Sequence, residues 1–187
     1  SRFLQISDRV QSLDCPQGSA VALGFFDGVH IGHQSVIKAA VDCARAEGLA
    51  AGVFTFRLPL SHQLKGGRLE TEADKHRVMA DLGVQVYLEP PFEEVCGQSP
   101  EEFVDQILVG AFRAKAVFCG DNFTFGKKAA GNVETLRTLC GQRGIRVVQV
   151  EMAQWQGKSV SSTRIRAALE AGDITAANTM LGRPYRI

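Results

Sequence analysis

The chain has 187 residues, with 21 lysines and arginines against 20 aspartates and glutamates, so its formal net charge is +1. A chain of this length can bury a sizeable core as one domain. A net charge this close to zero provides no field for a polyanion or an anionic membrane surface, so we expect neither nucleic acid nor membrane as a partner. No stretch approaches 18 consecutive apolar residues and the N-terminus lacks a signal-peptide core, so a cytoplasmic protein is expected.

Apolar runs alternate along the chain with amphipathic segments. In chain order, the pattern predicts strands over residues 20–25, 50–56, 84–88, 116–119 and 145–150, and helices over 34–47, 72–82, 100–109, 133–143 and about 162–171. Such alternation predicts an α/β fold, an open parallel five-stranded sheet with helices on both faces. Ligands of such sheets bind beyond the carboxyl ends of the strands.

The cysteines are five in number, widely spaced, and never in a CxxC pair or a cluster with zinc spacing: Cys15, Cys43, Cys96, Cys119 and Cys140. We therefore expect reduced, mostly packed thiols, with no disulfide framework and no protein-held metal site.

The first predicted strand leads into a glycine-rich turn, Gly24-Phe25-Phe26-Asp27-Gly28-Val29-His30-Ile31-Gly32-His33. Glycines let a ligand approach the backbone, and the amides at the start of the following helix attract phosphate. The turn has no GxGxxG pattern, and the segment from Gly120 to Lys128 does not fit the P-loop spacing. A lone histidine here would most simply cap the helix or pack in the turn, but the pair His30 and His33 favours phosphate binding.

A second polar motif precedes the last predicted helix and reads Ser161-Ser162-Thr163-Arg164-Ile165-Arg166. A hydroxyl at this place could simply cap the helix, and the arginines could be solvated. Hydroxyls, helix amides and a guanidinium that converge on one point would instead clamp a triphosphate.

The two motifs together resemble the HxGH nucleotidyltransferase superfamily, which adopts a Rossmann-like nucleotidyltransferase fold. Three segments across nearly the whole chain look more particularly like the bacterial FAD synthetase family: residues 24–34, residues 120–132, which begin Gly120-Asp121-Asn122-Phe123-Thr124-Phe125-Gly126, and Leu181-Gly182-Arg183-Pro184-Tyr185. This resemblance implies that AMP passes from ATP to FMN, giving FAD and pyrophosphate, with Mg²⁺ on the phosphates.

The resemblance also implies roles for individual residues. It places catalytic contacts at His30, His33 and Arg166, ATP-binding positions at Gly24, Phe26, Asp27, Gly32, Ser161, Ser162 and Thr163, and flavin-binding positions at Asn122, Phe123 and Phe125. Two alternatives stay open: Asp27 could be a turn-forming residue that bonds nearby amides, and the two phenylalanines could be core residues at strand spacing.

Two departures from the family pattern stand out. Members usually follow the second strand with Thr-Phe-Asp-Pro-His-Pro, whereas this chain has Thr55-Phe56 followed by Arg57-Leu58-Pro59-Leu60-Ser61-His62. Bacterial members also continue into a riboflavin kinase domain, whereas we expect residues 1–187 to be a single FMN adenylyltransferase domain. Either a separate riboflavin kinase is a partner, or the chain is the adenylyltransferase module alone. The competing hypotheses are another HxGH transferase, such as one making a cytidylyl or pantetheine product, and a catalytically weak flavin or nucleotide sensor.

Overall fold

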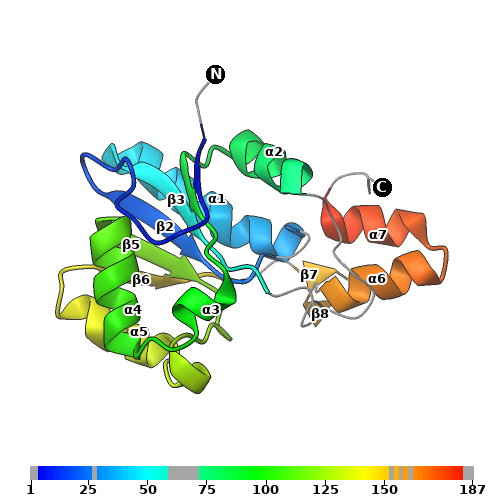
Figure 1. Ribbon diagram of the computed structural model, residues 1–187. Coiled ribbons are helices and arrows are strands. Elements are labelled where there is room, and N and C mark those ends of the chain that lie inside the picture. The colour runs from blue at the N-terminus through cyan, green and yellow to red at the C-terminus, as the bar shows by residue number, and fades with distance from the viewer. Residues whose placement is uncertain are drawn as a thin grey trace.

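The computed structural model describes residues 4–26, 29–58, 72–151, 154–155, 158–159 and 162–182. Within these residues, one open sheet of six parallel strands has the order β1-β4-β3-β2-β5-β6 (Figure 1). Its strands are β1 (Gln5–Ser7), β2 (Ser19–Leu23), β3 (Ala50–Phe54), β4 (Val86–Leu88), β5 (Ala114–Cys119) and β6 (Arg146–Gln149). A small antiparallel pair, β7 (Gln154–Trp155) with β8 (Lys158–Ser159), follows.

Most of the helices lie between the parallel strands in the sequence, and two more, α6 (Ser162–Glu170) and α7 (Ile174–Leu181), follow the last strand. They are α1 (Ile31–Glu47), α2 (Glu72–Leu82), α3 (Phe92–Val95), α4 (Pro100–Phe103), the π-helix η2 (Val104–Ala111), the short 3-10 helix η3 (Lys127–Ala129), α5 (Val133–Gly141), α6 (Ser162–Glu170) and α7 (Ile174–Leu181). No helix of the described residues is both long and apolar enough to span a membrane.

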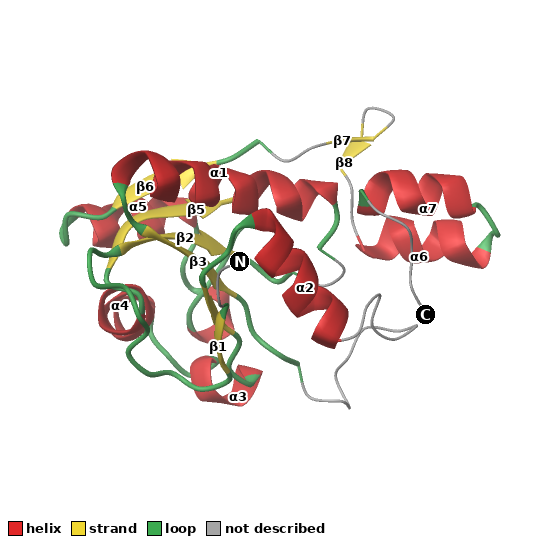
Figure 2. Cartoon of the chain, turned by 90° about the horizontal axis from the view of Figure 1, so that it is seen from above, coloured by secondary structure: helices red, strands yellow, loops and turns green. Residues whose placement is uncertain are grey.

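Two hydrophobic cores cover the two faces of the sheet. Successive side chains of a strand point to opposite faces, and in β2 Ala20 and Ala22 pack with α1 and α2, while Val21 and Leu23 pack with α4, η2 and α5. All five residues of β2 are buried, which explains why residues 20–23 form a continuous apolar run after Ser19. Figure 2 shows α1 and α2 apart from α4 across the sheet.

The strand order reverses between β2 and β5. From β2 the chain first builds outward through β3 and β4, and it then returns to pair β5 with the other side of β2. The carboxyl ends of these two strands border the place where open α/β sheets bind ligands.

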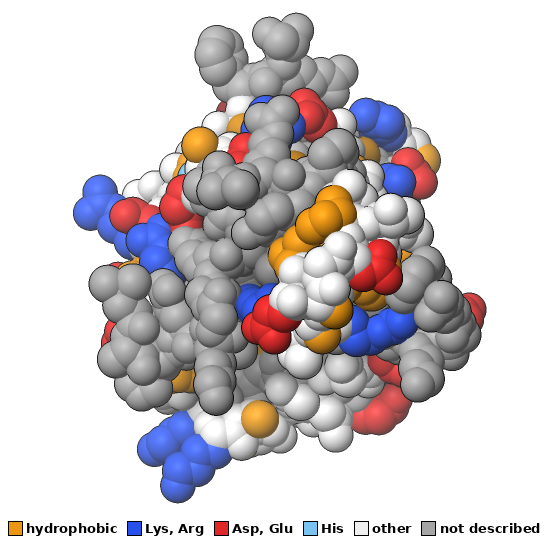
Figure 3. Space-filling model, turned by 90° about the vertical axis from the view of Figure 1, so that its right-hand side faces the viewer, with side chains coloured by type: hydrophobic (Ala, Val, Ile, Leu, Met, Phe, Trp, Pro, Cys, Tyr) orange, Lys and Arg blue, Asp and Glu red, His pale blue; other side chains and the backbone are white. Residues whose placement is uncertain are grey.

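The C-terminal helices α6 and α7 pack together beside the sheet (Figure 1). They enclose a small core of Ile165, Ala176, Ala177, Met180 and Leu181, against which Ile31 of α1 is packed. The described side chains on the face turned to the viewer in Figure 3 include acidic and basic groups interspersed with one another.

The expected α/β class, the parallel sheet and helices on both of its faces are confirmed. The strand count was one short, because β1 has three residues and lies at the edge of the sheet. The helix expected over residues 100–109 is present as α4, which continues into η2 with π geometry as far as Ala111. Helix α7 was not expected, although Asp173 caps its start and Gly182 its end.

Candidate functional site

The turn after β2 begins with a close contact that only glycine permits. A Cβ on Gly24 would lie 2.6 Å from the Phe26 ring. The Phe26 amide donates to Oγ1 of Thr55 at 3.2 Å, so the turn is tied to the chain just beyond β3. Thr55 is 1% exposed and Phe26 2% exposed, and the Phe26 ring packs in the core beneath the turn.

The two histidines form one stacked unit at the start of α1. His30 is the N-cap, and its Nδ1 accepts a hydrogen bond from the His33 amide at 3.3 Å. The imidazole rings stack with centroids 3.5 Å apart, and the His33 ring also meets Phe26 edge to face at 5.2 Å. Gly32, which lies between the two histidines in the sequence, is buried in the first helical turn. His30 therefore does cap the helix, and it does so at a helix N-terminus that suits an anion.

Backbone strain is stored next to this pair. Val29 has a φ of 38° and no exposed surface. A β-branched residue in the left-handed region costs roughly 1–3 kcal/mol, and such strain persists where the surrounding structure fixes it, often at functional sites.

Helices α6 and α7 are anchored to this same turn. The Gln34 side-chain amide donates to the Val29 carbonyl and to the Leu181 carbonyl, both at 3.0 Å. Ile165 of α6 is fully buried in the small core that includes Ile31 as a packed neighbour. The first turn of α6, which belongs to the second sequence motif, is thereby held on the side of the molecule where α1 begins.

The structure places most, but not all, of the expected nucleotide-binding residues. Thr163 is exposed, and Arg164 and Arg166 are half-buried on α6. Asp27 and Ser161 lie outside the described residues, as does the side chain of Ser162.

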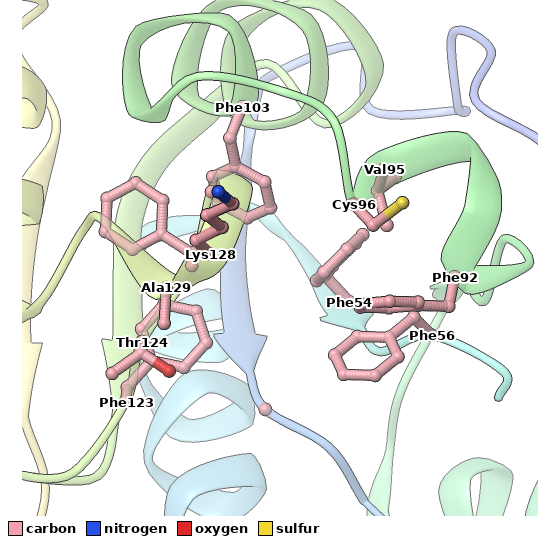
Figure 4. A pocket seen from close by; sticks show the side chains of 13 residues that line it. Phe54, Phe56, Phe92, Val95, Cys96, Phe103, Phe123, Thr124, Lys128 and Ala129 are labelled. Atoms are coloured by element: carbon pink, nitrogen blue, oxygen red, sulfur yellow. The ribbon is translucent and has the colours of Figure 1, made fainter. Parts of the chain in front are cut away.

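An aromatic pocket of about 210 Å³ opens at the carboxyl ends of β2, β3 and β5 (Figure 4). Six of the described phenylalanines line it: Phe54, Phe56, Phe92, Phe103, Phe123 and Phe125. The remaining lining residues are Gly24, Val95, Cys96, Thr124, Gly126, Lys128 and Ala129. A pocket walled by flat rings suits a planar aromatic ligand.

The rings of the pocket are fixed by packing against one another. Phe123 and Phe125 stack with centroids 5.8 Å apart and an interplanar angle of 14°, and Phe125 meets Phe103 at 5.1 Å. Close passage of Gly131 holds Phe125 from behind, since a Cβ there would lie 2.6 Å from its ring. Phe123 and Phe125 thus serve the core and the pocket at once, so the two alternatives for them are compatible.

Sequence reasoning found only part of this pocket. Asn122 lies exposed in the turn after β5, beside Phe123 but outside the set of lining residues. Phe54, Phe56, Phe92 and Phe103 were not singled out, although two of them sit at the end of β3 or just beyond it, where sheet ligands bind.

A buried ionic cluster lies at the end of β4, where Glu89 follows Leu88. Glu89 is 2% exposed, and its carboxylate lies 3.8 Å from Nζ of the buried Lys75 and 3.5 Å from Nε of Arg57. The Tyr87 hydroxyl also donates to Glu89. Arg57, at the first altered position of the family motif, is thus bound to the sheet by a carboxylate of this chain.

Two further groups flank the cluster. Ligand atoms of Glu72, His76 and Glu89 lie within 4.8 Å of one another. Because Lys75 and Arg57 already compensate the Glu89 carboxylate, we interpret these groups as an ionic network and not as a metal centre.

A histidine pair at a helix N-terminus, beside the point where the strand order of a parallel sheet reverses, is typical of an α/β protein that binds a phosphate group. The family model of FAD synthetase matches residues 12–164. The chain belongs to the FAD synthetase family.

Individual relatives agree with this assignment. A bifunctional riboflavin kinase/FMN adenylyltransferase from Bacillus subtilis (strain 168) is 39% identical over 176 residues, which are 90% of this chain and 55% of the relative. A putative bifunctional riboflavin kinase/FMN adenylyltransferase from Geobacillus thermodenitrificans is 32% identical over 183 residues, covering 97% of this chain and 98% of the relative. The chain spans about half the length of the Bacillus protein.

The fold is also shared with a solved structure. A crystal structure of a protein described as a macrolide-efflux protein from Streptococcus pneumoniae superposes with a TM-score of 0.83 at 25% identity, over 98% of this chain and 72% of that one.

Proposed function

We propose that this chain is an FMN adenylyltransferase, which transfers the AMP group of ATP to FMN and releases FAD and pyrophosphate. The observation that carries the proposal is the position of Gly24, which lines the aromatic pocket and also begins the turn that leads to the two histidines. A planar ring in the pocket would therefore have its polar tail next to the start of α1.

The reaction suits a site without a general base. An oxygen of the FMN phosphate attacks the α-phosphorus of ATP, a new P–O bond forms, and the bond to the bridging oxygen breaks with its electron pair leaving on pyrophosphate. A phosphate monoester has its second pKa near 6, so this nucleophile is mostly dianionic at neutral pH. Catalysis then depends on in-line positioning and on donors that strengthen as charge builds on the leaving group.

The proposed donors come from two elements. His30 accepts the His33 amide through Nδ1 at this helix N-terminus, and we assign its imidazole to a phosphate oxygen of ATP. We assign His33, Gly32 and the first amides of α1 to the same triphosphate.

The second element is the start of α6 and the segment before it. We assign Ser161, Ser162, Thr163 and Arg166 to the triphosphate as well, and Asp27 to the nucleotide half of the site.

Mg²⁺ is part of the proposal as the ion that arrives with ATP. Magnesium sites in such enzymes use substrate phosphates together with one or two carboxylates. The described residues of the turn offer imidazole and amide groups, which suit phosphate oxygens, and we propose that the carboxylate of Asp27 would help to hold the ion. When bound, the ion would neutralise charge on the phosphates.

The flavin half of the site is the aromatic pocket. Phe123 and Phe125 form one wall, and Phe56 and Phe92 lie together near the opposite edge, with ring centroids 5.2 Å apart. We assign Asn122 to the rim, where its amide can donate to and accept from polar atoms of a flavin.

A second candidate is a flavin-binding protein with little turnover. It is favoured by Arg57, which replaces the acidic residue expected after Thr55-Phe56 and is held by Glu89. Both candidates would bind FMN, but only the adenylyltransferase would produce FAD.

The test is chromatography of the chain incubated with FMN, ATP and Mg²⁺, beside a sample without ATP. New FAD that depends on ATP supports the adenylyltransferase. If FMN binds, as measured by quenching of its fluorescence, and no FAD forms, the binding protein is the correct function.

A further inference from the structure

One cationic side chain enters the aromatic pocket. Lys128 is among the lining residues, and Figure 4 shows its side chain pointing toward Phe103, on the side away from helix α1. Phe103 is 3% exposed and packs against Phe54 and Phe125, so it forms the buried floor of the pocket.

The backbone that presents Lys128 is strained. Lys128 and Ala129 have φ values of 53° and 55°, in the left-handed region that residues with a Cβ rarely occupy. Such a conformation is unfavourable for residues of this kind and persists only where the surrounding structure fixes it. Lys128 thus reaches the pocket lining from a left-handed backbone position inside the short helix η3.

A ligand that fills the pocket must provide a hydrogen-bond acceptor for the Lys128 ammonium. Lys128 is an exposed residue that lines the pocket, and a ring bound there would remove water from its ammonium. An ammonium that loses its water without gaining an acceptor makes binding unfavourable. The pocket therefore selects against an apolar ring edge at this point and favours an edge that carries acceptor oxygens.

The acceptor is part of the ring and not the phosphate tail. The proposed transfer needs the phosphate at the start of α1, whereas Lys128 points away from that helix. We propose that Lys128 determines ligand specificity by donating hydrogen bonds to the carbonyl-bearing edge of the heteroaromatic ring system, and thereby sets which end of the ring enters the pocket. This inference rests on the proposed binding of a flavin, whose pyrimidine-like ring carries two carbonyl groups while its other end carries only methyl groups.

The experiment compares riboflavin and FMN, which share the ring and differ in the phosphate. Each is titrated by flavin fluorescence against the unmodified chain, Lys128→Met and Lys127→Met. Methionine keeps an unbranched stem, so the backbone cost at position 128 stays the same. Lys127 is the matched control, because it is a neighbouring exposed lysine outside the set of lining residues.

We expect Lys128→Met to weaken both flavins by the same factor, roughly tenfold, as for one hydrogen bond to a charged group. Lys127→Met should bind both flavins normally. A loss confined to FMN would overturn the ring assignment and place Lys128 on the phosphate, and an unchanged affinity for both flavins would show a merely solvated lysine. If the unmodified chain binds neither flavin, the proposed function itself fails, and this inference fails with it.

Discussion

The two histidines at the start of α1 differ in what they do for the fold. His30 is buried as the helix cap, whereas His33 lies half-buried in the first turn. We expect His33→Ala to lower kcat by about a hundredfold, which is the usual cost of one transition-state donor. FMN affinity should change little, because the aromatic pocket is formed by other residues. The rate of FAD formation by the unmodified chain and by the variant checks this prediction. A folded variant with full activity would show that His33 has only a structural role.

The two arginines of α6 provide a paired comparison on one helix. Both are half-buried, but the resemblance to the family implies a catalytic contact at Arg166 and none at Arg164. Arg166→Ala should therefore reduce kcat/KM for ATP more than Arg164→Ala does. Arg166→Lys should not restore it fully, because an ammonium cannot chelate two phosphate oxygens as a planar guanidinium can. Equal losses from both alanine variants would contradict the assigned register.

The reaction rates of the cysteine thiols can test whether a ligand occupies the aromatic pocket. Burial raises the pKa of Cys15 and Cys119 to about 11 and that of Cys140 to about 12, so their thiolates are scarce at pH 8. Cys43 and Cys96 are half-buried, and Cys96 lines the pocket. A chromogenic disulfide reagent at pH 8 should modify these two thiols first.

A bound ligand adds an internal control to that experiment. FMN should slow the modification of Cys96 and leave that of Cys43 unchanged. Equal protection of both thiols would place FMN elsewhere or indicate a general change in stability.

At the level of elements, the buried ionic cluster connects α2 to the end of β4. Removing one partner of a buried pair leaves a charge without compensation and typically costs about 3 kcal/mol or more. We expect Lys75→Met to lower the free energy of unfolding by roughly this amount, reduced in part because Arg57 also neutralises Glu89. Arg77→Ala is the control, because Arg77 lies two residues after Lys75 on the same helix. Its side chain is 42% exposed and pairs with Asp74. Exposed pairs of this kind contribute about 0–1 kcal/mol.

Urea titration of both variants makes the measurement. The double variant Lys75→Met, Glu89→Leu should be less destabilised than Lys75→Met alone, since no buried carboxylate remains. If Lys75→Met proved as mild as Arg77→Ala, the cluster would contribute nothing to stability beyond its packing.

The elements with strong periodicity were predictable from the sequence, and the ones fixed by tertiary contacts were not. The buried run of β2 and the apolar face of α1 carry their own pattern, so their type follows from sequence alone. Edge strand β1 is only three residues long, too short to show a periodic pattern in the sequence. Its pairing with β4 makes it a strand.

The candidate site divides in the same way. Histidines, glycines and hydroxyls in the two motifs predict the nucleotide side, because these residue types have few other reasons to cluster. Phe92 and Phe103 come from α3 and α4 and reach the pocket only through the fold. Buried aromatic residues look alike in a sequence, whether they line a pocket or fill a core.

At the scale of the whole molecule, the junction between α1 and the C-terminal helices depends on close packing at Gly182. A Cβ there would lie 2.9 Å from the Ile31 side chain, and its φ is 80°. Gly172→Ala is a matched control, because its φ is 77° but nothing lies within 4 Å of the added Cβ. Both variants carry the left-handed strain of about 1 kcal/mol, and only Gly182→Ala adds a clash.

Gly182→Ala should therefore loosen α6 and α7 and raise the KM for ATP, while Gly172→Ala loses only stability. Hydrogen exchange over α6 and α7, measured with and without ATP, is the direct readout. Identical exchange in the two variants would mean that the junction does not depend on this contact.

The strand order also decides when the molecule can fold. The central strand β2 pairs with β3 a short distance along the chain, but its other edge waits for β5, where Ala20 meets Ala116. As the chain leaves the ribosome, one edge of this fully buried strand stays uncovered until the residues of β5 have been made. Contacts between residues so distant in sequence slow folding and expose the nascent chain to association through that edge.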